Sequence, residues 1–202
     1  MFKNIIFDFG NVLAEFYPEK LTSPCVSDIE NVKFISEVVF DRLYWNKLDD
    51  GTITDEEVKE AFKNRVPEEL YNTACTVYDS WVKNLTPVKG MSEIVKELKK
   101  KENAKLFLLS NISIGFAESY KIVPWIQELL AQFDGLVFSG PLGMVKPKKE
   151  IFEYLLNENN LIADECLFID DSRINIDGAK KVGIHGYLFD GDAEKLRVFL
   201  GI

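Results

Sequence analysis

Five short apolar runs, separated by longer helical patterns, constrain the fold of this 202-residue chain most strongly. The runs are continuously hydrophobic, as strands are when both faces of a sheet are covered, and do not alternate between apolar and polar residues. They span Asn4–Asp8, Lys105–Ser110, Gly135–Ser139, Cys166–Asp170 and His185–Phe189. Because strands that alternate with helices favour parallel pairing, the pattern predicts an α/β fold with a parallel sheet.

The stretch from about residue 16 to residue 85 interrupts this alternation. It has few strand-like runs, and its apolar residues follow a helical period over Ile29–Leu43 and Thr54–Arg65. We therefore expect two parts. Residues 1–15 and 86–202 would form an α/β core, and residues 16–85 would form a helical insertion after the first strand.

Composition narrows the classes of partner. Lys and Arg number 24 and Asp and Glu number 33, so the formal net charge is −9. Such a surface repels nucleic acid and anionic lipid, and no apolar run approaches the ~18 residues of a membrane helix. The three cysteines form no Cys-x-x-Cys pair, which is typical of a reducing compartment. We expect a cytoplasmic monomer or homodimer that binds neither nucleic acid nor a membrane.

Polar side chains stand at the carboxyl ends of three predicted strands. Asp8 ends the first strand, Ser110 ends the second, and Asp170 ends the fourth, with Asp171 directly after it. In an open parallel sheet, ligands bind outside the carboxyl ends of the strands. We therefore expect these side chains to share one site.

Three neighbouring carboxylates, those of Asp8, Asp170 and Asp171, would repel one another without a cation. A hard divalent ion with oxygen ligands, above all Mg2+, would stabilise them. Two simpler interpretations remain open. Asp8 could cap the turn that Gly10 and Asn11 favour, and the Asp pair could cap the next helix and face water. The position of the pair after a buried strand favours the metal site.

Two further segments carry groups that suit an anion. Ser110 and Asn111 offer a hydroxyl and a backbone N–H, which together could bind a phosphoryl oxygen. They could equally cap a helix. Lys146 precedes Pro147 at a predicted helix start, so it could reach an anion or an acidic nucleophile. The alternative is an ordinary solvated lysine.

Taken together, these segments resemble the four motifs of the haloacid dehalogenase (HAD)-like hydrolase superfamily. In order they are Asp8-x-Gly-Asn-Val12, Leu109-Ser110-Asn111, Lys146-Pro147 and Ile169-Asp170-Asp171. The helical insertion stands where that family has its cap domain. The resemblance implies a Rossmann-like core with a parallel sheet and a small α-helical cap inserted after the first strand. The motifs look closest to bacterial sugar-phosphate phosphatases of the glucose-1-phosphatase kind.

What the resemblance implies is phosphoryl transfer. The chain would be a phosphatase for a small phosphorylated metabolite, a sugar phosphate such as glucose 1-phosphate. Asp8 would attack phosphorus and form an aspartyl-phosphate. Ser110 and Asn111 would bind the phosphoryl oxygens, and Lys146 would neutralise charge on Asp8 and the phosphate.

The resemblance also implies Mg2+ as the cofactor. Its expected ligands are Asp8, the backbone carbonyl of Gly10, and Asp171. Asp170 is a further candidate ligand, so the division between the two adjacent acids stays open. Asn175 would brace the site.

The sequence departs from the family pattern at Gly10. Most phosphatases of the superfamily carry a second Asp there, as general acid and base, and its loss would typically cost about 10²–10⁴-fold in rate. Two alternatives follow. Haloacid dehalogenases also lack this Asp, need no metal, and use a cap arginine, which here could be Arg42. The second alternative is a non-catalytic protein that binds a phosphorylated ligand. The pair Asp170-Asp171 favours the phosphatase.

Substrate specificity is expected to come from the insertion, because the core site contacts only the phosphoryl group. The candidates are aromatic rings, which stack on the C–H face of a sugar, and nearby carboxylates. They are Phe16, Tyr17, Tyr44, Trp45, Asp49, Asp50, Tyr78 and Trp81. The alternative is that the aromatic residues pack inside the insertion.

Overall fold

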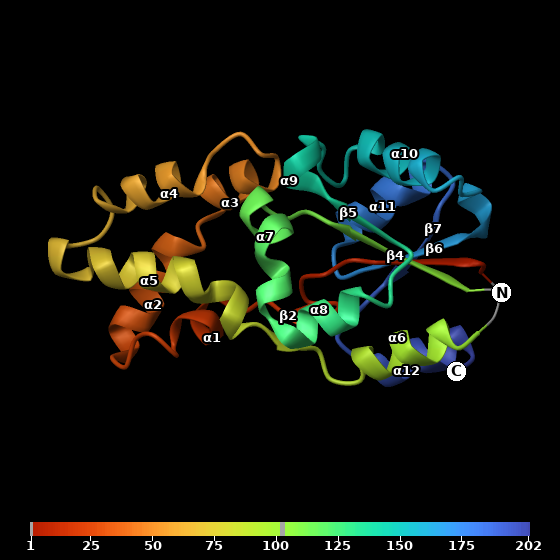
Figure 1. The fold of residues 1–202 in the computed structure, drawn as a ribbon, viewed down its shortest axis with the longest axis horizontal. Helices are drawn as coiled ribbons and strands as arrows, with labels where there is room; N and C mark the ends of the chain where they lie inside the picture. Colours follow the sequence, from red (N-terminus) through yellow and green to blue (C-terminus); the bar gives the residue numbers. More distant parts are fainter. Residues whose placement is uncertain (1, 102–103) are drawn as a thin grey trace.

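The computed structural model describes residues 2–101 and 104–202, so Met1, the first residue of the predicted core, lies outside it. A five-stranded parallel sheet with the order β5-β4-β1-β6-β7 forms the centre (Figure 1). Its strands are β1 (Asn4–Phe7), β4 (Lys105–Ser110), β5 (Gly135–Phe138), β6 (Cys166–Asp170) and β7 (His185–Leu188). Each lies within one residue of a predicted strand, so the parallel sheet is confirmed.

Helices cover both faces of this sheet (Figure 1). One face carries α10 (Lys149–Glu158) and α11 (Arg173–Lys181), and the other carries α6 (Met91–Lys99), α8 (Pro124–Leu130) and α12 (Ala193–Leu200). Adjacent residues of a strand point to opposite faces, so Ile6 packs under the first layer and Phe7 under the second. Burial on both sides explains why the strands are continuously apolar.

Short elements complete the core. They are α7 (Ile114–Ser119), α9 (Ser139–Leu142) and two 3-10 turns, Tyr120–Ile122 and Ala163–Glu165. Among the residues described, no helix combines the length and the apolar character needed to cross a lipid bilayer.

The segment between the first strand and the rest of the sheet is helical, as predicted. It contains α1 (Pro18–Thr22), α2 (Ile29–Val39), α3 (Arg42–Asp49), α4 (Asp55–Phe62) and α5 (Glu68–Asn84). These helices lie together at one end of the molecule (Figure 1). Where the chain leaves the core and returns to it, β2 (Ala14–Glu15) pairs antiparallel with β3 (Thr86–Pro87). Boundaries at residues 15/16 and 85/86 stay a prediction.

A single helix over Ile29–Leu43 was the wrong expectation, because the structure divides it into α2 and α3. The side chain of Asp41 accepts a hydrogen bond of 2.8 Å from the N–H of Leu43 and begins a new helix. A side-chain cap of this kind satisfies a free N–H at a helix start. The helix α3 that begins here lines a cavity at the carboxyl ends of the strands.

Candidate active site

Topology brings the predicted acids to one place. β1 lies between β4 and β6, and the crossovers that follow β1 and β6 lead to opposite sides of the sheet, to β4 and to β7. This reversal leaves a crevice at the carboxyl ends of the two strands. Asp8 follows β1, and its N–H extends the ladder by bonding the carbonyl of Ile169 at 2.9 Å. Ser110 and Asp170 end the flanking strands.

Lys146 is the cation that joins two of these acids. Its Nζ lies 2.7 Å from Oδ1 of Asp8 and 2.8 Å from Oδ2 of Asp170. All three residues are buried, and buried charges are tolerated only when they are paired and hydrogen-bonded. Asn111 fixes the backbone of Lys146: its Nδ2 donates to the lysine carbonyl at 3.0 Å, and its Oδ1 accepts from the lysine N–H at 2.8 Å.

The two adjacent acids differ in their surroundings. Asp170 has no exposed surface, and both of its oxygens accept hydrogen bonds, from the N–H of Ser172 at 2.8 Å and from Nδ2 of Asn175 at 3.1 Å to each. Asp171 is exposed and accepts one bond, of 3.3 Å, from Nδ2 of Asn11. Asp171 therefore keeps oxygen atoms available for a ligand, whereas Asp170 does not.

The electrostatics of the group favour an added cation. Burial raises the pKa of Asp8 to about 7, although the charge of Lys146 opposes the rise. Burial would lower the pKa of Lys146, but the charges of Asp8 and Asp170 raise it above its ordinary value. Partial burial and the charge of Asp170 also raise the pKa of Asp171. Burial and the charge of Asp170 thus disfavour the ionised forms of Asp8 and Asp171, and an added cation would stabilise them.

These residues fit a divalent metal ion. One carboxylate oxygen from each of Asp8, Asp170 and Asp171 lies within 4.8 Å of the others. Hard cations such as Mg2+ prefer oxygen ligands of this kind. A divalent ion would also balance the charge that Lys146 leaves uncompensated.

A cavity of about 560 Å3 opens above the cluster. The structure places all of the predicted site residues in its lining except the buried Asp170: Asp8, Gly10, Ser110, Asn111, Lys146 and Asp171. Asn175, the predicted brace, also lines it. The walls add one face of α3, namely Arg42, Trp45, Asn46 and Asp49. Asn46 was not predicted from the sequence, although its spacing from the other three residues follows the helical period.

Of the eight predicted specificity residues, four line this cavity, namely Phe16, Trp45, Asp49 and Trp81. The other four, Tyr17, Tyr44, Asp50 and Tyr78, do not line it. Tyr78 instead donates a hydrogen bond of 2.6 Å to Oδ1 of Asp55.

The aromatic residues of the wall also pack against one another. The ring centroids of Phe16 and Trp45 are 5.1 Å apart, as are those of Trp45 and Trp81. Nε1 of Trp45 donates to the carbonyl of Val39 at 2.7 Å, so its polar atom is satisfied within the protein. These rings therefore present an apolar wall and form part of the core at the same time.

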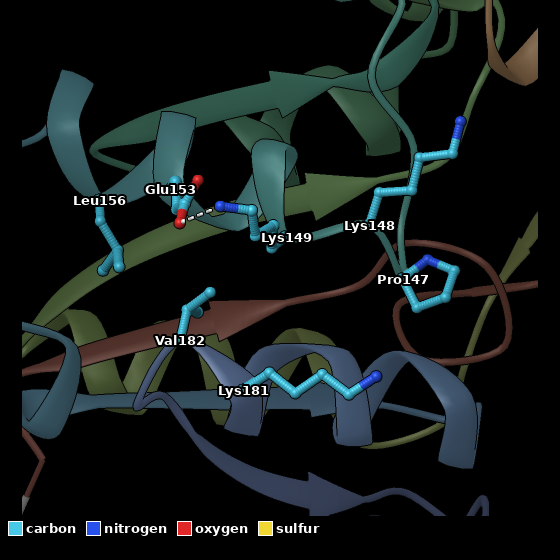
Figure 2. Close-up of a pocket in the computed structure, with 7 residues that line it drawn as sticks. All are labelled: Pro147, Lys148, Lys149, Glu153, Leu156, Lys181 and Val182. Atoms are coloured by element: carbon cyan, nitrogen blue, oxygen red, sulfur yellow. Dashed lines mark hydrogen bonds and ion pairs between the residues drawn. The ribbon is translucent and has the colours of Figure 1, made fainter.

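A second hollow, of about 620 Å3, lies between α10 and α11 (Figure 2). Its polar lining consists of exposed lysines, Lys148, Lys149 and Lys181, and of Glu153. Lys149 is paired with Glu153 at 3.3 Å. A surface groove of solvated lysines has no buried nucleophile, so the chemistry concentrates in the first cavity.

The family model for haloacid dehalogenase-like hydrolases matches residues 2–183. This chain belongs to the HAD-like hydrolase family. The match covers most of the chain and confirms the family that the four motifs predicted.

Known relatives of this HAD-like hydrolase include phosphatases. A D-ribitol-5-phosphate phosphatase from Bacteroides thetaiotaomicron is 25% identical, over 96% of this chain and 95% of the relative. A sesquiterpene phosphatase from Aspergillus oryzae is 26% identical, over 92% of this chain and 88% of the relative.

Solved structures confirm the fold class, a Rossmann-like HAD core with a helical cap. A HAD family enzyme from Bacteroides thetaiotaomicron, in complex with magnesium and inorganic phosphate, matches with a TM-score of 0.70 and 22% identity, over 97% of this chain and 99% of the other. L-2-haloacid dehalogenase from Xanthobacter autotrophicus matches with a TM-score of 0.66 and 16% identity, over 92% of this chain and 76% of the other. The fold is therefore shared with an enzyme that binds magnesium and phosphate and with a dehalogenase.

The departure at Gly10 is visible in this HAD-like hydrolase. A Cβ built on Gly10 meets no atom within 4 Å, so the space above it is open. Position 10 therefore contributes no acid or base side chain to the cavity.

Proposed function

We propose that this chain is a Mg2+-dependent phosphatase that hydrolyses a small sugar or polyol phosphate through an aspartyl-phosphate on Asp8. The observation that carries the proposal is the cluster of Asp8, Asp170 and Asp171 around Lys146 at the base of the cavity. The relatives named phosphatases support it, because they match nearly the whole chain.

Asp8 is the nucleophile in this proposal. Its Oδ1 accepts from the N–H of Phe9 at 2.7 Å and from Lys146. Its Oδ2 accepts no hydrogen bond from any described residue, so this oxygen is available to the ligands of the cavity. Lys146 orients the carboxylate and favours its charged form against the effect of burial, and an attacking oxygen requires both. The attack forms a bond from a carboxylate oxygen to phosphorus as the ester oxygen leaves.

Ser110 and Asn111 hold the transferred group. Ser110 is buried, and its hydroxyl bonds no other residue in the described parts of the chain, although it lines the cavity. Asn111 uses its side chain on Lys146, so its backbone N–H is the group that would bind a phosphoryl oxygen. Donors that are fixed before the substrate arrives stabilise charge in the transition state without reorganisation.

The metal ligands follow from the hydrogen bonds. Asp171 and Asp8 would hold Mg2+ directly, with the backbone carbonyl of Gly10 as a third ligand. Asp170 would orient Lys146, because its oxygens are already bonded to that lysine, Ser172 and Asn175. When bound, the ion supplies positive charge that offsets the phosphoryl oxygens and the acid cluster.

The cavity fits a small organic group. Its volume of about 560 Å3 lies within the usual range for metabolite sites. Trp45 and Trp81 offer an apolar wall, while Asn46 and Arg42 offer polar contacts to hydroxyl groups. A sugar or polyol presents both kinds of surface.

Phosphate release from a panel of sugar, polyol and isoprenyl phosphates tests this function. Each ester is assayed with Mg2+ and with a chelator. We expect Mg2+-dependent release from at least one sugar or polyol phosphate. Metal-independent halide release from a 2-haloacid would establish the dehalogenase alternative instead. Tight binding of the esters without turnover would establish a non-catalytic protein.

A further inference from the structure

The proposed reaction needs a proton that the base of the cavity does not supply. An alkoxide is a poor leaving group, so the ester oxygen must gain a proton as its bond to phosphorus breaks. Gly10 has no side chain to donate a proton, Asp8 is the nucleophile, and Asp171 is a proposed metal ligand. Asp170 is fully hydrogen-bonded, and the charges of Asp8 and Asp170 hold the proton on Lys146. A proton donor must therefore come from another wall.

We propose that Asp49, at the end of the cap helix α3, is the general acid that protonates the leaving oxygen. The inference rests on the proposed phosphatase function, and it assigns the group that replaces the missing acid at position 10. Asp49 lines the same cavity as Asp8.

The carboxyl group of Asp49 has no other use in the fold. It is partly buried, yet it makes no hydrogen bond and no ion pair with any residue in the described part of the chain. Its neighbour Asp50 differs, because Oδ1 of Asp50 accepts from the N–H and the hydroxyl of Thr52. A buried carboxyl group without a partner lowers stability, so its presence in a ligand cavity points to a role there.

The backbone of Asp49 is fixed to the core. Its carbonyl accepts a hydrogen bond of 2.5 Å from Oγ of Ser139, and that hydroxyl accepts from the N–H of Ile112 at 2.8 Å. Gly51 makes the approach possible, since a Cβ there would come within 2.5 Å of the carbonyl oxygen of Gly140. The acid is thus positioned by the loops that follow β4 and β5.

The surroundings of Asp49 suit proton donation near neutral pH. Burial raises the pKa of its carboxyl group to about 6. The charges of Arg42 and Lys146 oppose the rise, and the charge of Asp50 adds to it. The most effective general acids have a pKa close to the working pH.

The reaction would proceed in two steps. In the first, Asp8 forms its bond to phosphorus, the ester P–O bond breaks, and the proton of Asp49 passes to the leaving oxygen to give the alcohol. In the second, the carboxylate of Asp49 takes a proton from water as that water attacks phosphorus. The P–O bond to Asp8 then breaks, which releases phosphate and restores both acids.

The choice of leaving group isolates the first step. We compare wild type and Asp49→Asn in single-turnover, rapid-quench experiments with a sugar phosphate that wild type hydrolyses and with p-nitrophenyl phosphate. Nitrophenolate leaves without a proton, whereas an alkoxide does not. Phosphorylation of Asp8 by the sugar phosphate is expected to slow about 10²–10⁴-fold. The initial burst of nitrophenolate is expected to change less than about twofold.

Asp177→Asn is the matched control, because it makes the same chemical change at an exposed residue of α11 that does not line the cavity. It should leave both rates within about twofold of wild type. Equal losses on both esters in Asp49→Asn would overturn the inference in favour of a structural role. A raised KM with an unchanged rate of phosphorylation would overturn the inference too, because Asp49 would then only bind the substrate.

Wild type provides an independent measurement if the variant does not fold. The ratio of its phosphorylation rate with the sugar phosphate to its rate with the nitrophenyl ester should fall as pH rises through about 6, where Asp49 loses its proton. Ionisation of Asp8, whose pKa is about 7, affects both esters and cancels in the ratio. The same pH dependence for both esters would overturn the inference. If wild type released no phosphate from any ester, the proposed function itself would fail. Undiminished turnover by Asp49→Asn would overturn only the role of Asp49.

Discussion

Charged side chains at the base of the cavity are paired with one another, whereas those on its α3 wall are not. At the base, Asp8, Lys146 and Asp170 are buried and tied to one another by ion pairs of 2.7 and 2.8 Å. On the wall, the side chains of Arg42 and Asp49 make no hydrogen bond or ion pair with any described residue. The base is therefore organised before a substrate arrives, whereas the wall has polar groups whose partners must come with the substrate.

This difference matches the two parts of a phosphate ester. The phosphoryl group is the same in every substrate, so groups that ion pairs already hold in place serve it best. The organic group varies, and unpaired side chains on a separate helix can serve it without disturbing the base. The paired groups at the base should therefore raise the free energy of unfolding, and the unpaired groups on the wall should not.

Replacing Asp8 by Asn tests the base most severely. The amide is a poor nucleophile, so turnover should fall on the order of 10⁴-fold or more, as measured by phosphate release. Asp177→Asn is the control, because Asp177 is exposed on α11 and does not line the cavity. Residual turnover of Asp8→Asn above about 1% of wild type would exclude Asp8 as the nucleophile.

Lys146→Met tests whether the two ion pairs at the base of the cavity stabilise the fold. Two buried carboxylates would lose their cation, so the free energy of unfolding should fall by about 3–5 kcal/mol in urea titrations without metal. Lys148→Met, a change of an exposed lysine, should stay within about 0.5 kcal/mol of wild type. A similar small change for Lys146→Met would show that the ion pairs do not stabilise the base.

Mg2+ should stabilise the folded protein by binding at the base of the cavity and not at its α3 wall. At 100 times its Kd, a ligand that binds only the folded protein raises the free energy of unfolding by about 2.7 kcal/mol. Thermal unfolding with Mg2+ and with a chelator measures this gain. It should disappear in Asp171→Asn and persist in Arg42→Met. An equal gain in Asp171→Asn would remove Asp171 from the ligand set.

The base was predictable from sequence because its signals are local. A buried parallel strand is continuously apolar, and a polar residue that ends it marks the edge where ligands bind. Asp8, Ser110 and Asp170 stand at such ends, so their shared location followed from the strand pattern alone. The roles of these residues in catalysis stay a prediction.

The wall was predictable only in part, because its position depends on contacts between distant segments. The apolar period runs without a visible interruption through the break at Asp41, so the separate helix α3 was missed. Asp49 was expected to contact substrate, but its unpaired state follows from the docking of α3 through Ser139 and Gly51. Nothing in the sequence near Asp49 specifies that docking.

Asp49→Asn should stabilise the protein while it impairs the reaction. The folded pKa of about 6 exceeds the ordinary value of 3.8, so the folded state binds the proton more tightly than the unfolded state does. Stability from this group is complete below a pH of about 4 and is lost as pH rises through about 6. Near pH 8 the variant should therefore be more stable, by on the order of 1–3 kcal/mol. Denaturant titrations at pH 4 and pH 8 measure the difference, and equal effects at both values would contradict the raised pKa.

Of these variants, Arg42→Met should have the smallest effect. Arg42 is exposed and unpaired among the described residues, so its loss should change the free energy of unfolding by less than about 0.5 kcal/mol. An exposed charge that meets an anionic substrate contributes little, and KM should rise about two- to fivefold with kcat unchanged. Lys47→Met is the control, because Lys47 lies on the same helix and does not line the cavity. Equal KM values for the two variants would mean that Arg42 does not contact the substrate. The charge of Arg42 would then act only at long range.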